Sequence, residues 1–303
     1  MSPNPKLTIL ITGCSPGGMG AALATTFHQA GHRVFATARN PSKLSPLAEQ
    51  GIETVTLDIT SPSSIAAAFT TVSSSLPDGA GLNILINNAA GSYTMPVVDA
   101  SLDEARALFD VNVWSHLAVT QAFLPLLLRS ASNENEATAM VVNHTSVGSL
   151  AALPFQGVYN ASKAALAMLT ETMRMELAAF GVEVVDLKTA GVKTNIIANN
   201  NVNTGLGKLP VGSIYEPARE VVEEAMSQRG LEDKGISAEQ WAAEVVSLLL
   251  GKNTPSVIWK GEGAMLVRLA VGMPGRLFEG AIKRMTKLDV VEGIVRGSRN
   301  GGC

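Results

Sequence analysis

The chain has 303 residues, of which 46% are hydrophobic and 16% are charged, and its formal net charge is −3. A chain of this length and composition can bury a large core in one or two domains, which excludes a disordered or fibrous protein. The chain lacks the excess of basic residues that is typical of a general nucleic-acid-binding protein. We therefore expect a small molecule, and no nucleic acid, as the partner.

Two cysteines, Cys14 and Cys303, are too few for a disulfide framework or a metal cluster, and no metal site is expected. No apolar run reaches the roughly 18 to 20 residues of a membrane span, and the first residues lack the pattern of a secretion signal. The sequence therefore predicts a cytoplasmic protein.

Short runs typical of β-strands occur at residues 7–11, 33–37, 53–57, 82–86, 139–143, 182–187 and 256–259. Segments with helical spacing separate most of them, and residues 102–131 are predicted to form one long helix that Pro125 kinks. This alternation predicts an α/β fold, a doubly wound parallel sheet of about seven strands with helices on both faces. We expect a single domain over residues 5–260 and a helical extension over residues 261–303.

The stretch "ITGCSPGGMG", residues 11–20, holds four glycines directly after the first predicted strand. A bare turn lets a phosphate approach the backbone and the N–H groups at a helix N-terminus, so the pattern indicates a dinucleotide site. Gly13 and Gly18 have the spacing that begins a P-loop, but Met19 and Gly20 replace its lysine and hydroxyl residue. The stretch also differs from G-x-G-x-x-G, which leaves a plain tight turn as the alternative.

Candidate reactive residues follow further along the chain. Tyr159 and Lys163 stand four residues apart in "YNASK", so on a helix they share one face. Ser146 follows the fifth predicted strand, at the edge where parallel strands present ligand-binding groups. Asn112 interrupts an otherwise apolar helix face. His144 and Cys14 are expected to be structural rather than reactive.

In this order and spacing, these residues resemble the short-chain dehydrogenase/reductase family over roughly residues 6–260. The motifs that carry the resemblance are the glycine stretch, Asp58, "NNAAG", Asn112, Ser146, "YNASK" and "AGVKT" at 190–194. The resemblance implies the Rossmann fold, a homo-oligomer, and a catalytic tetrad of Asn112, Ser146, Tyr159 and Lys163. It also implies that Asn112 holds a water that relays protons to Lys163.

The same resemblance implies which residues surround a nicotinamide dinucleotide. They are Gly13, Ser15, Gly17, Gly18 and Met19 in the turn, Asp58 and Ile59 at the adenine, Asn87 and Ala89 at the ribose region, Val192 and Thr194 at the carboxamide, and Tyr159 and Lys163. The turn is one residue longer than the family's Thr-Gly-x-x-x-Gly-x-Gly, so either Gly17 or Gly18 takes the middle position. Ala190 stands where a proline is common.

The side chains indicate the chemistry. Tyr159 can protonate a carbonyl oxygen if Lys163 lowers the phenol pKa from about 10, and Ser146 can stabilise the charge on that oxygen. An NAD site usually places an acid about 20 residues after the glycine turn, but none occurs between Gly20 and Glu49. Arg39 lies there instead, where a guanidinium can bind a 2′-phosphate, and NADP(H) is the predicted cofactor.

These features predict NADP(H)-dependent reduction of a ketone or aldehyde. The chain most resembles the fungal branch that contains NADPH-dependent 1-acyldihydroxyacetone-phosphate reductases, which favours a lipid-like or secondary-metabolite carbonyl. Two alternatives stay open, an alcohol-oxidising dehydrogenase of steroid or retinoid type and a non-catalytic dinucleotide sensor. The intact Ser146, Tyr159 and Lys163 count against the sensor.

Two surfaces suggest contacts with other molecules. The predicted helices over 103–128 and 158–180 are apolar over more surface than one sheet face can cover, which favours a homodimer or homotetramer.

Residues 260–303 hold eight basic and four acidic residues, and Phe278, Ile282 and Met285 recur there at helical spacing. This basic amphipathic helix has two interpretations: it caps the substrate cleft, or it docks on an endoplasmic-reticulum or lipid-droplet membrane.

Overall fold

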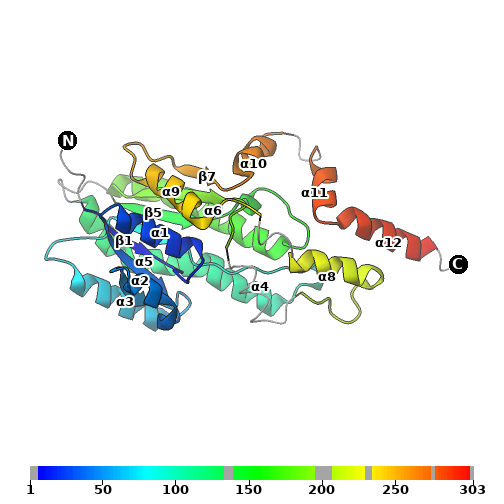
Figure 1. Ribbon diagram of the computed structural model, residues 1–303, viewed down its shortest axis with the longest axis horizontal. Helices are drawn as coiled ribbons and strands as arrows, with labels where there is room; N and C mark the ends of the chain where they lie inside the picture. The colour runs from blue at the N-terminus through cyan, green and yellow to red at the C-terminus, as the bar shows by residue number, and fades with distance from the viewer. Residues whose placement is uncertain (1–5, 133–138, 195–206, 229–233, 274–276, 301–303) are drawn as a thin grey trace.

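The computed structural model describes residues 6–132, 139–194, 207–228, 234–273 and 277–300 as a single domain (Figure 1). Its centre is a seven-stranded parallel sheet with the order β3-β2-β1-β4-β5-β6-β7. The strands are β1 Thr8–Ile11, β2 Arg33–Ala38, β3 Glu53–Thr56, β4 Ile84–Asn87, β5 Met140–His144, β6 Glu183–Thr189 and β7 Val257–Lys260. The predicted doubly wound sheet is confirmed, and each strand lies within two residues of its predicted bounds.

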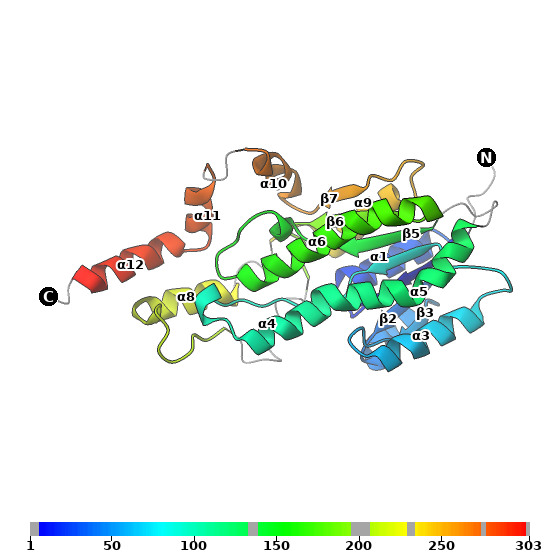
Figure 2. The same cartoon turned by 180° about the vertical axis from the view of Figure 1, so that it is seen from behind.

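Helices cover both faces of the sheet, as the two opposite views show (Figures 1 and 2). One face packs against α1 Met19–Gln29, α2 Ser45–Ala48 and α9 Ala238–Leu249, around the buried Phe27 and Trp241. The other face packs against α3 Pro62–Ser75, α5 Ser115–Ala131 and α6 Gly157–Leu177, around Phe123. The central strands β1 and β4 are buried on both faces and therefore read as nearly continuous apolar runs in the sequence.

The predicted long helix over residues 102–131 is confirmed, with one π-helical turn within it. It consists of α4 Leu102–Phe109, a π-helical turn over Asp110–Trp114 that contains Asn112, and α5, in which Pro125 lies. Among the described residues, the stretch Leu102–Ala131 is the one helix long and apolar enough to cross a membrane by length and composition. Half of it is buried within the fold, as in the core helix of a globular domain.

The chain after β7 forms α10 Ala264–Val271, α11 Glu279–Met285 and α12 Leu288–Asn300. The helix α12 packs on α8 Arg219–Ser227 through Val291, which is 2% exposed, and the Lys287 Nζ lies 2.7 Å from a carboxylate oxygen of Glu224. The predicted basic helix around Ile282 forms as α11, next to which Phe278 is half-buried; Ile282 is half-buried too, and Met285 is 65% exposed. Burial of the extension therefore comes from α12, which joins an apolar cluster that also contains Phe155.

Candidate active site

The sheet order places a crevice between β1 and β4, because the connections from these neighbouring strands run to opposite sides. A cavity of about 420 Å³ lies along the carboxyl edge of the sheet. It receives residues that follow six of the strands: Gly13, Arg39, Asp58, Ala89, Ser146 and Ala190. The cavity therefore occupies the position where doubly wound folds bind their ligands.

Most of the sequence-predicted site residues line this one cavity. They are Gly13, Ser15, Gly18, Met19, Arg39, Asp58, Ile59, Ala89, Ser146, Tyr159, Lys163, Val192 and Thr194. Gly17, Asn87 and Asn112 do not line it. Residues that sequence reasoning missed also line it, among them Asn88 and His144.

The glycine turn is shaped by close contacts that a side chain would block. Gly13 has a positive φ of 76°, and a Cβ there would lie 2.7 Å from the Ala89 Cα. A Cβ at Gly20 would lie 2.5 Å from the Gly13 carbonyl oxygen, so this glycine lets α1 approach the turn. Both positions require glycine for steric reasons.

The helix α1 begins beside the cavity. Gly18 is its N-cap, lines the cavity and provides no side-chain cap, whereas Gly17 adopts a positive φ of 71° and makes the bend before it. The first-turn N–H groups of a helix have no intrahelical partner, and together with the helix dipole they attract an anion. This part of the cavity therefore fits the pyrophosphate of a dinucleotide.

Asn87 takes a different place from the one predicted. Its side-chain Nδ2 donates hydrogen bonds to Thr120 Oγ1 and Asn143 Oδ1, both at 2.9 Å, beneath the sheet edge. The next residue, Asn88, lines the cavity, and its Nδ2 donates to the Thr12 carbonyl oxygen at 2.8 Å. Asn87 is therefore a structural residue between strands and helix, and Asn88 is the asparagine at the ligand surface.

One end of the cavity carries Arg39 and Asp58. Arg39 is exposed, directly after β2. Asp58 accepts hydrogen bonds from the Thr60 hydroxyl at 2.7 Å and the Thr60 N–H at 3.0 Å. These bonds, and to a smaller extent the charge of Arg39, lower the pKa of the Asp58 carboxyl, which is therefore ionised at neutral pH.

The other end of the cavity brings Ser146, Tyr159 and Lys163 together. Ser146 follows β5 and caps a 3₁₀ turn over Val147–Ser149, where its Oγ accepts the Gly148 N–H at 3.0 Å. Tyr159 and Lys163 project from the first two turns of α6. The Lys163 Nζ is buried and donates to the His144 carbonyl oxygen at 2.8 Å.

The pKa values at this end depend mainly on burial. Burial raises the pKa of Tyr159 above its ordinary value of 10.0, and a hydrogen bond with Ser146 opposes this shift. The predicted lowering of the Tyr159 pKa is therefore absent in the chain alone, because loss of hydration disfavours the phenolate. Burial also lowers the pKa of Lys163 to about 8, against the opposing charge of Asp186.

Asn112 supports the site from behind the cavity. Its Oδ1 accepts the Gly91 N–H at 2.8 Å, and its Nδ2 donates to the Gly91 carbonyl oxygen and to Ser162 Oγ, both at 3.0 Å. The predicted water relay does not run through the Asn112 amide nitrogen, because two protein acceptors already occupy it. The π-helical turn aims this side chain inward, a distortion common at functional sites.

His116 and His144 are buried next to Lys163. The His116 Nε2 contacts the Ala89 carbonyl oxygen at 2.8 Å, and burial lowers the pKa of His116 to about 3. His144 bridges Asn88 and Thr189 and stacks on Trp241, which agrees with its predicted structural role. Burial and the charge of Lys163 keep both imidazoles neutral at neutral pH.

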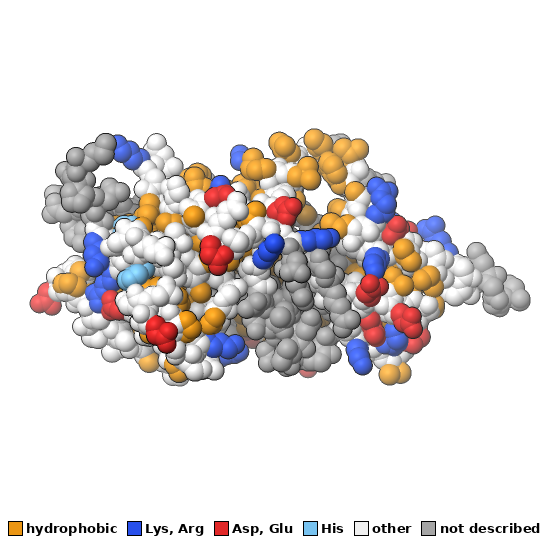
Figure 3. Space-filling model, in the orientation of Figure 1, with side chains coloured by type: hydrophobic (Ala, Val, Ile, Leu, Met, Phe, Trp, Pro, Cys, Tyr) orange, Lys and Arg blue, Asp and Glu red, His pale blue; other side chains and the backbone are white. Residues whose placement is uncertain are grey.

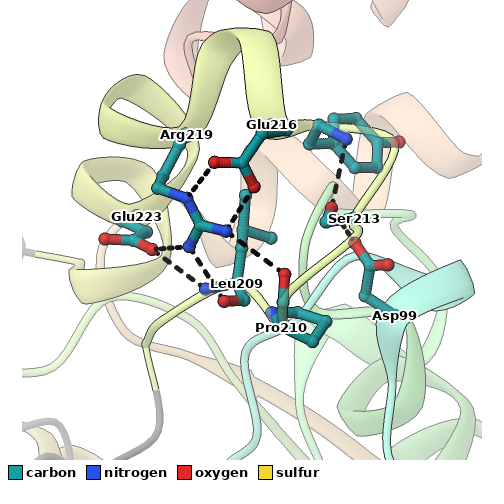
Figure 4. Close-up of polar contacts among 8 residues, drawn as sticks. Asp99, Leu209, Pro210, Ser213, Glu216, Arg219 and Glu223 are labelled. Atoms are coloured by element: carbon teal, nitrogen blue, oxygen red, sulfur yellow. Dashed lines mark hydrogen bonds and ion pairs between the residues drawn. The ribbon is translucent and has the colours of Figure 1, made fainter.

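A polar cluster around Arg219 holds the segment that contains Leu209, Pro210 and Glu216 (Figure 4). The Arg219 guanidinium donates to the carbonyl oxygens of Leu209 at 2.8 Å and Pro210 at 3.2 Å, and it pairs with the carboxylates of Glu216 and Glu223. Leu209 thereby joins the apolar cluster against which Tyr159 packs.

Comparison with known proteins assigns the family. The sequence model of the short chain dehydrogenase family matches residues 7–205. A short-chain dehydrogenase/reductase of Pestalotiopsis microspora is 50% identical over 291 residues, which cover 96% of this chain and 98% of that protein. The chain belongs to the short-chain dehydrogenase/reductase family.

A further relative agrees with this assignment, and a solved structure shows the same fold. The NADPH-dependent 1-acyldihydroxyacetone phosphate reductase of Schizosaccharomyces pombe is 32% identical over 290 residues, which cover 92% of this chain and 94% of that protein. A short-chain dehydrogenase from Streptomyces avermitilis has the same fold, with a TM-score of 0.71 at 24% identity over 97% of this chain and 98% of its own.

Family membership makes the chain an oxidoreductase that uses a nicotinamide dinucleotide. The glycine turn, the uncapped start of α1 and the extended cavity fit that group. Within the described part of the chain, no group of three or more His, Cys, Asp or Glu side chains could hold a metal ion.

Proposed function

We propose that this short-chain dehydrogenase/reductase reduces a ketone or aldehyde to an alcohol with NADPH. The observation that carries the proposal is the arrangement of one cavity, with Arg39 at one end and Ser146, Tyr159 and Lys163 at the other. A dinucleotide bound along this cavity would present its 2′-phosphate to the guanidinium and its nicotinamide to the reactive side chains.

A bound nicotinamide would supply the hydride that reduces the carbonyl carbon. The Ser146 hydroxyl would donate a hydrogen bond to the carbonyl oxygen and stabilise the negative charge that develops there. Tyr159 would give that oxygen its proton. Because burial raises the pKa of Tyr159, the phenol stays protonated at neutral pH, which is the form that an acid needs. Lys163, held by the His144 carbonyl, would fix its ammonium group near the ribose and the phenol.

The preference for NADPH over NADH rests on charge. Arg39 lies on the cavity wall and is exposed, so its guanidinium is available for a bidentate contact with a 2′-phosphate. The segment between Gly20 and Glu49 has no carboxylate to bind an unphosphorylated ribose. The relative from S. pombe is itself named as NADPH-dependent.

The substrate would be a mainly apolar, lipid-like or secondary-metabolite carbonyl. Tyr159 packs against a buried cluster that contains Phe155, Leu209 and Val222. Tyr215 packs against the same cluster, with its ring 6.4 Å from that of Phe155. These apolar side chains behind Tyr159 would favour substrates whose surface beyond the carbonyl is apolar.

The test is consumption of NADPH and of NADH by the purified chain with a panel of aliphatic, lipid and polyketide ketones and aldehydes. We expect turnover with NADPH and a smaller kcat/KM with NADH. Oxidation of steroid or retinoid alcohols with no carbonyl reduction would replace the proposal by the dehydrogenase alternative. Tight dinucleotide binding with no turnover of any compound would indicate a sensor.

We further propose that the enzyme is cytoplasmic and that α10 contacts the surface of an anionic membrane. Exposed apolar side chains gather over α10, near the top of the view in Figure 3, and Arg268 lies among them. They are Met265, Leu266, Leu269, Val271 and Met273. Full-length protein should sediment with anionic vesicles at low salt, and Leu266→Glu with Leu269→Glu should abolish this. Sedimentation that the double substitution leaves unchanged would contradict the contact.

A homodimer or homotetramer is proposed from a second exposed apolar surface. Trp114, Met168, Met175 and Phe180 are all more than half exposed on or directly next to α5 and α6. A stable interface that buried them would remove this area from water. Light scattering at micromolar concentration should give at least twice the 31.6 kDa mass of one chain. A single monomeric species would contradict the assembly.

A further inference from the structure

Strand β6 carries a buried ion pair next to the catalytic serine. Asp186 and Lys188 are two residues apart, so their side chains leave the same face of the sheet. The Lys188 Nζ lies 2.6 Å from a carboxylate oxygen of Asp186, and both side chains are less than a tenth exposed. The Lys188 ammonium also lies 5.8 Å from the centre of the Trp259 ring on the neighbouring β7.

Each member of the pair holds one side of the turn that carries Ser146. The Thr145 hydroxyl, directly before Ser146, donates a hydrogen bond to the Asp186 carboxylate. On the other side, the Lys188 Nζ donates to Ser149 Oγ at 3.1 Å. The turn itself closes through the Ser149 N–H, which donates to the Ser146 carbonyl oxygen at 3.0 Å.

A buried ion pair is a poor source of stability, because removing two charges from water costs about as much as their attraction returns. An apolar pair of similar volume is often as stable. Stability alone therefore does not account for charges at this place. Their fixed geometry on a rigid strand does offer a way to hold a catalytic loop.

We propose that Asp186 and Lys188 are positioning residues that hold the Thr145–Ser149 turn at both ends and so fix the hydroxyl of Ser146 in its reactive place. The proposal rests on the proposed carbonyl reduction, in which Ser146 binds the carbonyl oxygen. Neither residue lines the cavity. Loss of the pair should therefore reduce kcat and leave dinucleotide affinity unchanged.

The main test is the double substitution Asp186→Leu with Lys188→Met, which removes both anchors without leaving an unpaired charge. We expect kcat to fall about 10- to 100-fold, the effect of a misplaced catalytic group, with the Kd for NADPH within about two-fold. The control is Glu244→Leu with Lys260→Met, which makes the same change in the pair that joins α9 to β7 at 2.9 Å. The control should keep kcat within about two-fold.

A Ser146→Ala background separates positioning from general structural damage. If the pair acts through the Ser146 hydroxyl, the double substitution should cause little further loss of kcat once that hydroxyl is absent. Equal losses in the presence and absence of Ser146 would overturn the proposal. So would a double variant that retains the kcat of the wild type.

The pH dependence of kcat gives a second test of the arrangement. Lys163 is faced by Asp186 from β6, His144 from β5, His116 from α5 and Tyr159 from its own helix, and burial and the charge of Lys163 keep both histidines neutral near pH 7. The carboxylate of Asp186 raises the pKa of Lys163. Asp186→Asn should therefore move the alkaline limb of the kcat profile to lower pH, and Lys188→Met, which leaves Asp186 unneutralised, should move it to higher pH. Shifts of the same sign would contradict the arrangement.

A readout that needs no substrate keeps this proposal separate from the proposed function. Hydrogen exchange at the Ser149 amide should be faster in the Asp186→Leu, Lys188→Met variant than in the control. If the wild type reduces no carbonyl, the proposed function fails while this measurement still tests the anchored turn. Unchanged exchange at Ser149 would overturn the proposal.

Discussion

The two ends of the cavity are built in different ways. At the catalytic end, Lys163 is 2% exposed and bound to the His144 carbonyl, and Ser146 is held within its turn. At the other end, Arg39 is exposed. The end with Ser146 and Lys163 is built by packing and fixed hydrogen bonds. In the proposed function, the other end would select its ligand by the exposed charge of Arg39. Substitutions should therefore cost most at the buried end.

Tyr159→Phe tests the buried end with the largest expected effect. Loss of the phenol removes the proton donor, so kcat should fall by about 10²- to 10⁴-fold while the Kd for NADPH stays within a few-fold. Steady-state kinetics and a fluorescence titration with NADPH measure the two quantities. Tyr215→Phe is the control, because it removes a hydroxyl from the same apolar cluster. If both variants turn over like the wild type, Tyr159 is not the acid.

Arg39→Asp tests the exposed end. Removal of a charged hydrogen bond to the 2′-phosphate should weaken NADPH binding by about 1.5 to 3 kcal/mol and shift the preference toward NADH. Lys43→Asp makes a similar charge change four residues away, outside the cavity wall, and should have a smaller effect. Calorimetric titration with both dinucleotides gives the comparison. Equal losses in the two variants would mean that general charge, rather than a contact of Arg39, sets the affinity.

The buried histidines give the smallest effect, on stability. The pKa of His116 in the folded chain is about 3, below its ordinary value of 6.5, so the unfolded chain binds more protons between these values. The free energy of unfolding should therefore fall as the pH drops below 6.5, by about 1.4 kcal/mol per pH unit for this group. Denaturant unfolding at pH 7 and pH 5 measures the loss, which His116→Gln should reduce. An unchanged pH dependence in that variant would contradict the assignment.

Much of the fold and of the site was predictable, because the spacing of residues within single segments indicates it. The strand runs, the glycine turn and the four-residue step from Tyr159 to Lys163 are local patterns, and they predicted the sheet and most of the cavity wall. The sequence predicted Asn87 at the ligand surface, whereas the structure places Asn88 there, which shows the limit of such patterns. Successive side chains of a strand point to opposite sides, so an error of one residue moves an asparagine from the ligand surface into the core.

Other features depend on contacts between distant segments. The π-helical turn of the long helix contains Asn112, whose amide binds the main chain of Gly91 and the hydroxyl of Ser162. The link from Asp186 and Lys188 to the Ser146 turn spans about 40 residues of sequence, as the 41-residue separation of Thr145 and Asp186 shows. Contacts between segments so far apart cannot be predicted from the residue pattern within one segment.

The most direct test of the account follows the hydrogen itself. The purified enzyme is incubated with NADPH that carries deuterium at both C4 positions of the nicotinamide and with each carbonyl compound of the panel, and the products are analysed by mass spectrometry. The account predicts an alcohol with one deuterium on the former carbonyl carbon, formed by the wild type and at least about 100-fold more slowly by Tyr159→Phe. Transfer at an equal rate in both proteins, or no transfer from NADPH to any carbonyl, would contradict it.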